Sequence, residues 1–268
     1  MQIRINEQKC SVHKNITIGM LAEDHKPGAD VLILNGFPVP AETVLHADDE
    51  VFLILRGEIP SESELEALMA ARHTPGVHAR LKAAKVGIAG VGGLGSAIAV
   101  ALARVGVGHL VIADFDVVEP SNLNRQQYFV DQIGMHKVVA LAANLQRINP
   151  YVEVEQHTVM LNPDNIPVVF CGCSIIVEAF DRADMKAMLV NTVLERMPGV
   201  TVIAASGLAG YGSNNTIKTS KISARLYLIG DRVSEAQPGS GLMAPRVGIA
   251  AGHQANQVIR CILGESLA

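Results

Sequence analysis

The chain contains 268 residues, of which 49% are hydrophobic and 18% are charged, and its formal net charge is −4. This length is enough for two domains or one large one, and the composition excludes disorder for most of the chain. The acidic balance and the few aromatic residues argue against a broad nucleic-acid or membrane surface. The four cysteines form no CxxC pair, so we expect neither zinc nor a disulfide framework. The polar start and the absence of a long apolar run predict a cytoplasmic protein with no signal peptide or membrane span.

Residues 1–56 predict a small unit with the order strand, strand, helix, strand, strand. Apolar and polar residues alternate around Ile3 and again around Cys10, which is typical of a hairpin. The helix and the two later apolar runs occupy residues 17–23, 31–34 and 51–55. Asn35-Gly36 follows the first of these runs and is a strong turn signal. A ubiquitin-like β-grasp fold has this order within this length.

A break at residues 57–60 precedes a connecting helix that begins at Ser61 and reaches about Arg72. From residue 85 onward, strands and helices alternate. We expect strands at residues 86–89, 110–113, 152–156, 174–177 and 200–205, and helices at residues 94–105, 136–147, 184–196 and 245–263. This alternation predicts an α/β, Rossmann-like doubly wound sheet, mainly parallel, with helices on both faces. The chain thus divides into a β-grasp domain at 1–57, a helical linker at 58–84 and a larger domain at 85–268.

A glycine-rich loop joins the first strand of the larger domain to its helix. Its sequence is Gly90-Val91-Gly92-Gly93-Leu94-Gly95. Glycines let the backbone approach a phosphate closely, and a helix N-terminus presents free N–H groups and partial positive charge. Asp114 ends the next strand, where a carboxylate can bind ribose hydroxyls. The loop predicts a nucleotide site, and by itself it favours NAD.

The segment that follows the second strand is not typical of a dehydrogenase. Its sequence is DFDVVEPSNLNRQ, and its polar side chains at the ligand edge of the sheet are those of Asp114, Asp116, Asn122, Arg125 and Gln126. Lys137 begins the next helix, and Asp181 ends a later strand. Cations beside a phosphate-binding loop neutralise a triphosphate and its leaving pyrophosphate, and a carboxylate at a strand end can hold Mg²⁺. This pattern favours nucleotidyl transfer over hydride transfer.

Together these motifs resemble the ThiF/MoeB/HesA family, whose members are related to the ubiquitin-activating enzymes. The resemblance rests on GVGGLGS, on DFDVVEPSNLNRQ and on the positions of Lys137 and Asp181, and it covers residues 72–264. Residues 1–56 independently resemble ThiS, the thiamine sulfur carrier, through ILNGFPVP and DDEVFLIL. The chain is therefore similar to a ThiF-like protein with a fused ThiS-like domain.

The resemblance implies a role for each residue of the predicted site. The loop from Gly90 to Gly95 would bind ATP, with Asp114 on the ribose. The phosphates would lie against Arg125 and Lys137, and Asp181 would bind Mg²⁺. Asn122 would support the site, and Asp116 and Gln126 would lie beside the nucleotide. Arg72, with Arg80 as its competitor, would reach into the site of the partner subunit of a homodimer.

Members of this family adenylate the C-terminal glycine of a small β-grasp carrier protein. The resemblance implies that the carboxylate of a separate ThiS-like carrier attacks the α-phosphate of ATP and that pyrophosphate leaves. No side-chain nucleophile is needed, because the carboxylate is already ionised. The protein aligns the reactants and screens their negative charge. The likeness of residues 1–56 to ThiS favours thiamine thiazole synthesis as the pathway.

The sequence also departs from the family. It lacks the paired CxxC motifs of zinc-containing relatives, so no zinc is predicted. Residues 207–245 contain no Cys, so we expect the acyl-adenylate to persist until a separate sulfur donor protein meets it. The fused domain does not end in Gly-Gly and cannot itself be the substrate. Arg182 replaces the Asn that usually follows the Mg²⁺ aspartate.

Other functions stay open on the sequence alone. Within the same family, the substrate could be a molybdopterin-type carrier, another carboxylate or a modified tRNA nucleoside. The glycine loop also fits an NAD-linked oxidoreductase, and the fused domain fits a non-catalytic scaffold that binds carrier proteins. The cysteines, including Cys171 and Cys173, are expected to be packing residues rather than a redox pair.

Overall fold

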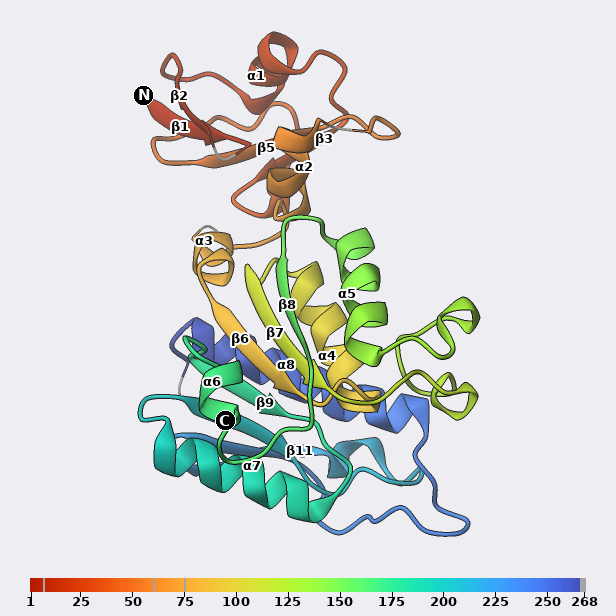
Figure 1. Cartoon of the computed structure of the whole chain (residues 1–268). Coiled ribbons are helices and arrows are strands. Elements are labelled where there is room, and N and C mark those ends of the chain that lie inside the picture. Colours follow the sequence, from red (N-terminus) through yellow and green to blue (C-terminus); the bar gives the residue numbers. More distant parts are fainter. Residues whose placement is uncertain (7, 60, 75, 266–268) are drawn as a thin grey trace. The chain divides into compact units, whose positions relative to one another are not determined.

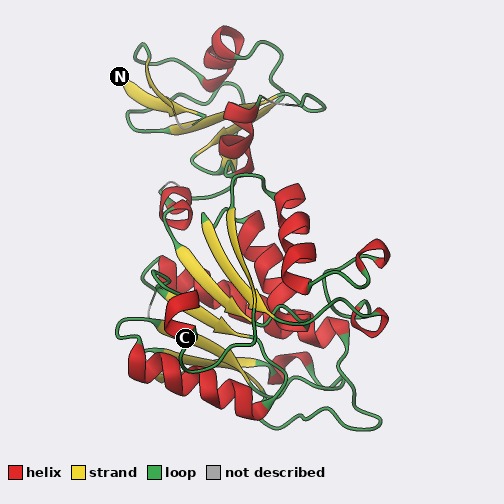
Figure 2. Cartoon of the chain, viewed as in Figure 1, coloured by secondary structure: helices red, strands yellow, loops and turns green. Residues whose placement is uncertain are grey.

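The computed structural model describes residues 1–6, 8–59, 61–74 and 76–265. The chain divides into two compact units, Met1–Ala79 and Arg80–Ala268. The boundary lies inside helix α3 (Val77–Lys82). Each unit has its own sheet and its own buried core (Figures 1 and 2). Among the described residues, no helix is long and apolar enough to cross a bilayer.

The first unit is built on a five-stranded sheet in the order β2-β1-β5-β3-β4. Its elements are β1 (Gln2–Ile5), β2 (Gln8–Ser11), α1 (Ile18–His25), β3 (Val31–Leu34), β4 (Phe37–Pro38), β5 (Glu50–Ile54) and α2 (Glu62–Met69). The predicted hairpin is confirmed, because β1 pairs with β2 in antiparallel register. The predicted turn is also confirmed. Asn35 and Gly36 have φ of 50° and 89° between β3 and β4, and a two-residue hairpin turn favours such positive angles.

Helices of the first unit cover both faces of its sheet. Successive residues of a strand point to opposite faces, and along β5 these residues join two different clusters. Leu53 packs with α1, whereas Phe52 packs with Ala67 and Ala71, which lie on and just after α2. The β-grasp fold is therefore confirmed, and α2 packs on the sheet instead of standing apart from it.

The second unit is built on a seven-stranded sheet in the order β11-β12-β10-β9-β6-β7-β8. Its strands are β6 (Lys85–Ala89), β7 (His109–Asp114), β8 (Glu153–Thr158), β9 (Ile175–Glu178), β10 (Thr201–Ala205), β11 (Lys218–Ser223) and β12 (Leu226–Gly230). Its helices after α3 are α4 (Gly93–Arg104), α5 (Lys137–Ile148), α6 (Ile166–Val169), α7 (Ala183–Arg196) and α8 (Ala244–Ile262). Three 3₁₀ turns lie at Pro120–Asn122, Val130–Gln132 and Asn214–Thr216. All neighbouring strands pair in parallel except β11 with β12, so the predicted mainly parallel sheet is confirmed.

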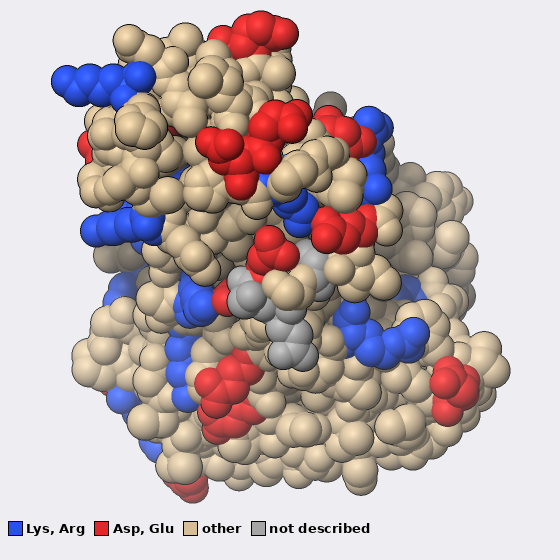
Figure 3. All heavy atoms as spheres, turned by 90° about the horizontal axis from the view of Figure 1, so that it is seen from above, with Lys and Arg blue, Asp and Glu red and all other residues tan. Residues whose placement is uncertain are grey.

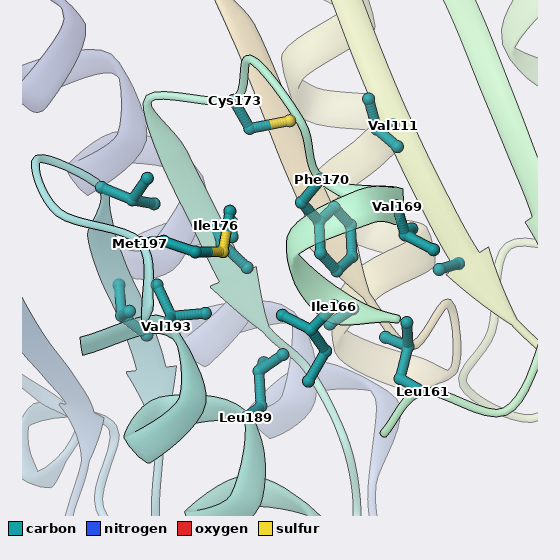
Figure 4. Packing of buried hydrophobic residues seen from close by; sticks show 14 of the residues in the cluster. Val111, Leu161, Ile166, Val169, Phe170, Cys173, Ile176, Leu189, Val193 and Met197 are labelled. Carbon is teal, nitrogen blue, oxygen red and sulfur yellow. The ribbon is translucent and has the colours of Figure 1, made fainter. Parts of the chain in front are cut away.

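Helices lie on both faces of this sheet. Figure 1 shows α4, α5 and α8 on one face and α6 and α7 on the other. On the second face, Figure 4 shows apolar side chains from β7, β9 and α7 gathered around the buried ring of Phe170. A Cβ on Gly87 of β6 would lie only 2.5 Å from that ring. The glycine therefore lets the ring approach the centre of the sheet closely.

The elements predicted from residue 85 onward are present, with ends that differ by one or two residues. The β11–β12 hairpin was not predicted. The single connecting helix that was expected from Ser61 to about Arg72 ends earlier, at Met69, and α3 follows it.

Candidate functional site

The predicted site lies at the carboxyl edge of the parallel sheet, where the strand order reverses. From β6 the chain proceeds to β7 and β8 on one side, and then returns to β9 and β10 on the other. In open α/β sheets the crevice at this switch point is where ligands bind. The glycine loop follows β6, and the turn that carries Asp181 follows β9. Because β6 pairs with β9, the fold places these two segments on neighbouring strands.

The glycine loop depends on the absence of side chains at two positions. Gly90 has a φ of 86°, in the left-handed region that favours glycine. A Cβ on Gly95 would overlap the carbonyl oxygen of Gly90, so α4 can begin this close to β6 only with glycine there. The first N–H groups of α4 have no acceptor within the helix. They and the helix dipole make the loop suitable for a phosphate group.

Asp114 ties the glycine loop to the segment after β7. Its Oδ2 accepts a hydrogen bond from the N–H of Val91 at 2.8 Å, and its Oδ1 accepts one from the N–H of Asp116 at 2.9 Å. The side chain is partly exposed. The structure therefore brings Asp114 to the loop, as the sequence predicted, and gives it a structural role there. Its binding of ribose stays a prediction.

Arg125 and Gln126 lie against the glycine loop. A Cβ on Gly93 would be 3.6 Å from the Cγ and Cδ atoms of Arg125, and a Cβ on Gly92 would be 3.7 Å from Nε2 of Gln126. Gln126 is buried, and its Oε1 has no hydrogen-bond partner among the described residues. An amide held at the loop with a free acceptor is available to a ligand donor.

Asn122 shapes the turn that presents these two side chains. It is buried, and its Oδ1 accepts a hydrogen bond from the N–H of Glu119 at 3.1 Å. Its carbonyl oxygen accepts from the N–H groups of Arg125 at 3.1 Å and Gln126 at 2.9 Å. Asn122 therefore holds the backbone of this turn, and its support of a bound nucleotide stays a prediction.

Lys137 and Asp116 form an ion pair at the start of α5. Nζ of Lys137 lies 2.8 Å from Oδ2 of Asp116, and the two side chains are 8% and 47% exposed. An ammonium group buried this far needs a compensating charge. The pair thus fixes a cation at the edge of the sheet, and it joins two residues that the sequence assigned separately to the nucleotide site.

Asp181 is exposed in the turn between β9 and α7. Three residues before it, Glu178 is fully buried, and Nζ of Lys186 lies 3.0 and 3.1 Å from its carboxylate oxygens. Burial raises the pKa of Glu178, and Lys186 opposes this shift together with backbone N–H groups. Among the described residues, no group of three or more His, Cys, Asp or Glu side chains is arranged to hold a metal ion.

Arg246 anchors the segment that follows β10. It is buried in the first turn of α8, and its Nη1 donates to the carbonyl oxygens of Gly212 and Ser213, both at 3.0 Å. Its Nη2 donates to Oδ2 of Asp231 at 2.7 Å. Partial burial would raise the pKa of Asp231, but hydrogen bonds from Ser234, the backbone and Arg246 lower it to about 2.

Sequence reasoning missed several polar residues that are buried or partly buried near this edge: Ser96, Tyr128, Glu178, Lys186, Asp231, Arg246 and Gln254. The Tyr128 hydroxyl, for example, donates to the carbonyl oxygen of Val91 at 2.7 Å, and burial raises its pKa. A polar residue inside an apolar run was the available signal, as for Glu178 between Val177 and Ala179.

The two arginines that compete for the cross-subunit role have different surroundings. Nη2 of Arg80 donates to the carbonyl oxygen of Ile262 at 2.7 Å, near the C-terminus of α8, where a helix dipole attracts cations. Arg72 follows α2 in the first unit and is exposed. Arg80 is therefore engaged within its own unit.

Cys173 belongs to the hydrophobic core, as the sequence predicted. Burial raises the pKa of its thiol to about 12, so this thiol is neutral at physiological pH. Cys171 is exposed, so the prediction of a packing role was wrong for that residue.

A doubly wound sheet with a glycine loop at its switch point, and with Arg125 beside that loop, defines a Rossmann-like nucleotide-binding protein. Comparison with protein families supplies the finer assignment. Residues 66–268 match the ThiF family, and residues 1–57 match ThiS-like ubiquitin. The chain belongs to the ThiF family and carries a ThiS-like ubiquitin domain at its N-terminal side.

Curated relatives include two fungal proteins named adenylyltransferase and sulfurtransferase UBA4. The chain is 32% identical to the Candida glabrata protein over 192 residues, which are 69% of this chain and 44% of that protein. It is 32% identical to the Saccharomyces cerevisiae protein over 205 residues, which are 73% and 46% of the two chains. The chain thus spans less than half the length of these relatives.

Solved structures share the fold. The Escherichia coli tRNA N6-threonylcarbamoyladenosine dehydratase TcdA, in complex with ATP, matches with a TM-score of 0.68 at 20% identity, over 78% of this chain and 98% of that one. Escherichia coli MccB with AMPCPP and MccA matches with a TM-score of 0.56 at 25% identity, over 71% and 59% of the two chains.

Proposed function

We propose that the chain is an ATP-dependent adenylyltransferase that activates the C-terminal glycine of a separate ubiquitin-like sulfur carrier. The observation that carries this proposal is the composition of the switch point. A glycine loop faces Arg125 and Gln126, a buried ammonium lies at Lys137, and Asp181 follows the neighbouring strand. Cations and N–H donors around one loop suit ATP and its leaving pyrophosphate. The names of the UBA4 relatives and the ATP analogue bound to MccB support the same activity.

In this mechanism the residues of the site position the reactants and screen their negative charge, and none of them forms a covalent bond. The loop N–H groups and Arg125 hold the phosphates of ATP, while Asp114 holds the loop and is available to the ribose. The carrier carboxylate attacks the α-phosphorus, the bond to the β-phosphate oxygen breaks, and pyrophosphate leaves with that bond's electron pair. Lys137 screens the charge that gathers on the phosphates.

Mg²⁺ fits this site through Asp181. Magnesium in phosphoryl-transfer sites is held by one or two carboxylates together with the phosphates of the substrate. The exposed carboxylate of Asp181, in the turn that follows β9, would supply one such ligand. When bound, the ion would neutralise phosphate charge during the transfer.

The carrier in this proposal is a separate protein, and two observations support that choice. The fused domain continues into α2 and does not end in a free glycine carboxylate. Each face of its sheet also carries one of its own helices. We expect that a separate sulfur donor protein then receives the acyl-adenylate.

We further propose that the working form is a homodimer in which Arg72 reaches the partner's site. The exposure of Arg72 and the engagement of Arg80 with α8 support Arg72 over Arg80. The ThiS-like match of residues 1–57 favours thiamine thiazole synthesis as the pathway.

A modified tRNA nucleoside is the competing substrate, and TcdA shares the fold. The net charge of the chain favours a protein substrate instead. The net charge is −4, and on the face shown in Figure 3 acidic and basic side chains are interspersed. Nucleic-acid sites usually show a basic patch or stripe.

ATP–pyrophosphate exchange tests the proposed function. We expect the purified chain to catalyse exchange with a separate carrier that ends in Gly-Gly, and not with the same carrier lacking its last glycine. Exchange without any carrier would contradict the proposal and indicate a small carboxylate or self-adenylation. Exchange that requires tRNA would indicate that the substrate is a tRNA nucleoside instead of a carrier protein.

The same assay tests the site residues. Arg125→Ala and Asp181→Ala should each lower exchange by about a hundredfold or more, because each removes a charge that acts on the phosphates. Arg104→Ala and Asp24→Ala are matched controls at exposed positions and should retain wild-type exchange. Near-wild-type turnover in either site variant would remove that residue from the site.

A further inference from the structure

The carboxylate of Glu178 joins three elements of the second unit. Glu178 is the last residue of β9, and its side chain is fully buried. Oε1 accepts a hydrogen bond from the N–H of Phe180 at 2.7 Å, in the turn after the strand. Oε2 accepts one from the N–H of Ala205 at 3.3 Å, at the end of β10. Lys186 on α7 contributes the compensating charge, at 3.0 and 3.1 Å from the two oxygens.

The turn held by Glu178 also packs on the glycine loop. The N–H of Ala179 donates to the carbonyl oxygen of Ala89 at 2.9 Å. A Cβ on Gly90 would lie 3.0 Å from the carbonyl oxygen of Ala179 and 3.1 Å from Cδ1 of Phe180. Asp181 is the next residue. The position of Asp181 beside the loop is therefore set by Ala179, which is hydrogen-bonded to β6, and by Phe180, which is hydrogen-bonded to Glu178.

Filling space at the end of β9 does not require a charged residue. The other residues of β9, Ile175 to Val177, are buried and apolar. Withdrawing a carboxylate from water is unfavourable unless a charge and hydrogen-bond donors surround it. Here each oxygen has a backbone donor from a different strand end as well as the ammonium of Lys186. The Glu178–Lys186 pair therefore holds the backbone after β9 and the backbone at the end of β10 together.

We propose that Glu178 is a positioning residue of the nucleotide site: held by Lys186, its carboxylate fixes the turn that carries Asp181 against the glycine loop. The role of that turn in catalysis rests on the proposed function. How firmly the turn is held can be measured by hydrogen exchange, whether or not the chain catalyses adenylation.

The first test compares Glu178→Gln with the wild type as full-length chains. Gln keeps the shape but replaces one acceptor by a donor, which faces the N–H of either Phe180 or Ala205. We expect the Mg²⁺ concentration for half-maximal exchange to rise about tenfold, while ATP binding in EDTA stays within about twofold. Glu195→Gln, at an exposed position on α7, should change neither value. An unchanged Mg²⁺ dependence in Glu178→Gln would overturn the proposal.

The second test shortens the acid. Glu178→Asp keeps the negative charge but withdraws the carboxylate by one methylene from the N–H groups of Phe180 and Ala205. We expect this variant to raise the Mg²⁺ requirement as Glu178→Gln does, because a charge that lacks those hydrogen bonds does not fix the turn. A wild-type Mg²⁺ requirement in Glu178→Asp would overturn the proposal. If Glu178→Gln fails to fold, the uncharged pair Glu178→Gln with Lys186→Met replaces it in the first test.

Hydrogen–deuterium exchange separates this proposal from the proposed function. In Glu178→Gln, the amides of residues 179–182 should exchange about tenfold faster than in the wild type, without faster exchange in α4. This result would support the positioning role even if the wild type catalysed no pyrophosphate exchange, an outcome that would contradict only the proposed function. Unchanged protection of the turn would overturn the positioning role.

Discussion

Asp231 and Arg246 form an ion pair whose side chains are only 13% and 5% exposed. The pKa of Asp231 is lowered in the folded state from 3.8 to about 2, so the unfolded chain takes up this proton first as the pH falls. The stability from this group is complete above the unfolded value and is lost as the pH falls toward 2. At neutral pH it contributes at most about 2 kcal/mol.

Urea denaturation of Asp231→Asn checks this expectation. The variant should have a lower free energy of unfolding than the wild type at pH 7, and the difference should shrink as the pH falls from 5 toward 2. Asp164→Asn removes a carboxylate that is 93% exposed and should show little difference at any pH. A difference for Asp231→Asn that stays constant across this range would contradict the assigned pKa.

For single residues, the sequence predicted that Arg125 and Gln126 lie at the ligand edge, but it did not predict the hydrogen bonds and ion pairs that fix the side chains of this edge. Arg125 and Gln126 were predictable because the motif places them after the second strand, at the ligand edge. The Lys137–Asp116 pair was not, because two residues 21 positions apart in the chain meet only through tertiary packing. Glu178 was missed for a related reason, since its partners lie on three elements.

Among the elements, the junction of β6 with α4 tolerates the least side-chain volume in the site. Gly95→Ala would place a methyl group on the carbonyl oxygen of Gly90 and move the start of α4 away from the strand. We expect ATP binding by calorimetry to weaken at least about tenfold. Gly248→Ala in α8 is the matched control, because its Cβ would meet open space. That control should bind ATP normally and be about 1 kcal/mol more stable, and equal binding by both variants would contradict the role of Gly95.

The elements also show where sequence patterns fail. Strands and helices with regular apolar periods were predicted to within one or two residues. β11 was not, because it is an edge strand whose side chains are mostly exposed and polar, so it lacks an alternating apolar face. The contact of α2 with the first sheet was missed as well. It depends on Phe52 and Ile33 facing away from α1, which only the register of the sheet reveals.

For the whole molecule, the proposed homodimer predicts complementation between two inactive variants. If Arg72 acts in the partner's site, mixed dimers of Arg72→Ala with Asp181→Ala contain one complete site. An equimolar mixture allowed to exchange subunits should then recover about a quarter of wild-type pyrophosphate exchange. Replacing Arg72→Ala by Arg80→Ala in the mixture tests the competing arginine. No recovery, with dimers present by sedimentation, would contradict the assignment of Arg72.

The central claim is that the chain transfers AMP to the terminal glycine of a separate carrier. The most direct measurement is the intact mass of every protein after incubation with ATP, Mg²⁺ and pyrophosphatase. The account predicts one adenylyl group on a carrier that ends in Gly-Gly, none on a carrier without the last glycine and none on the chain itself. An adenylyl group on the chain, or an unmodified carrier beside a chain that binds ATP, would contradict it.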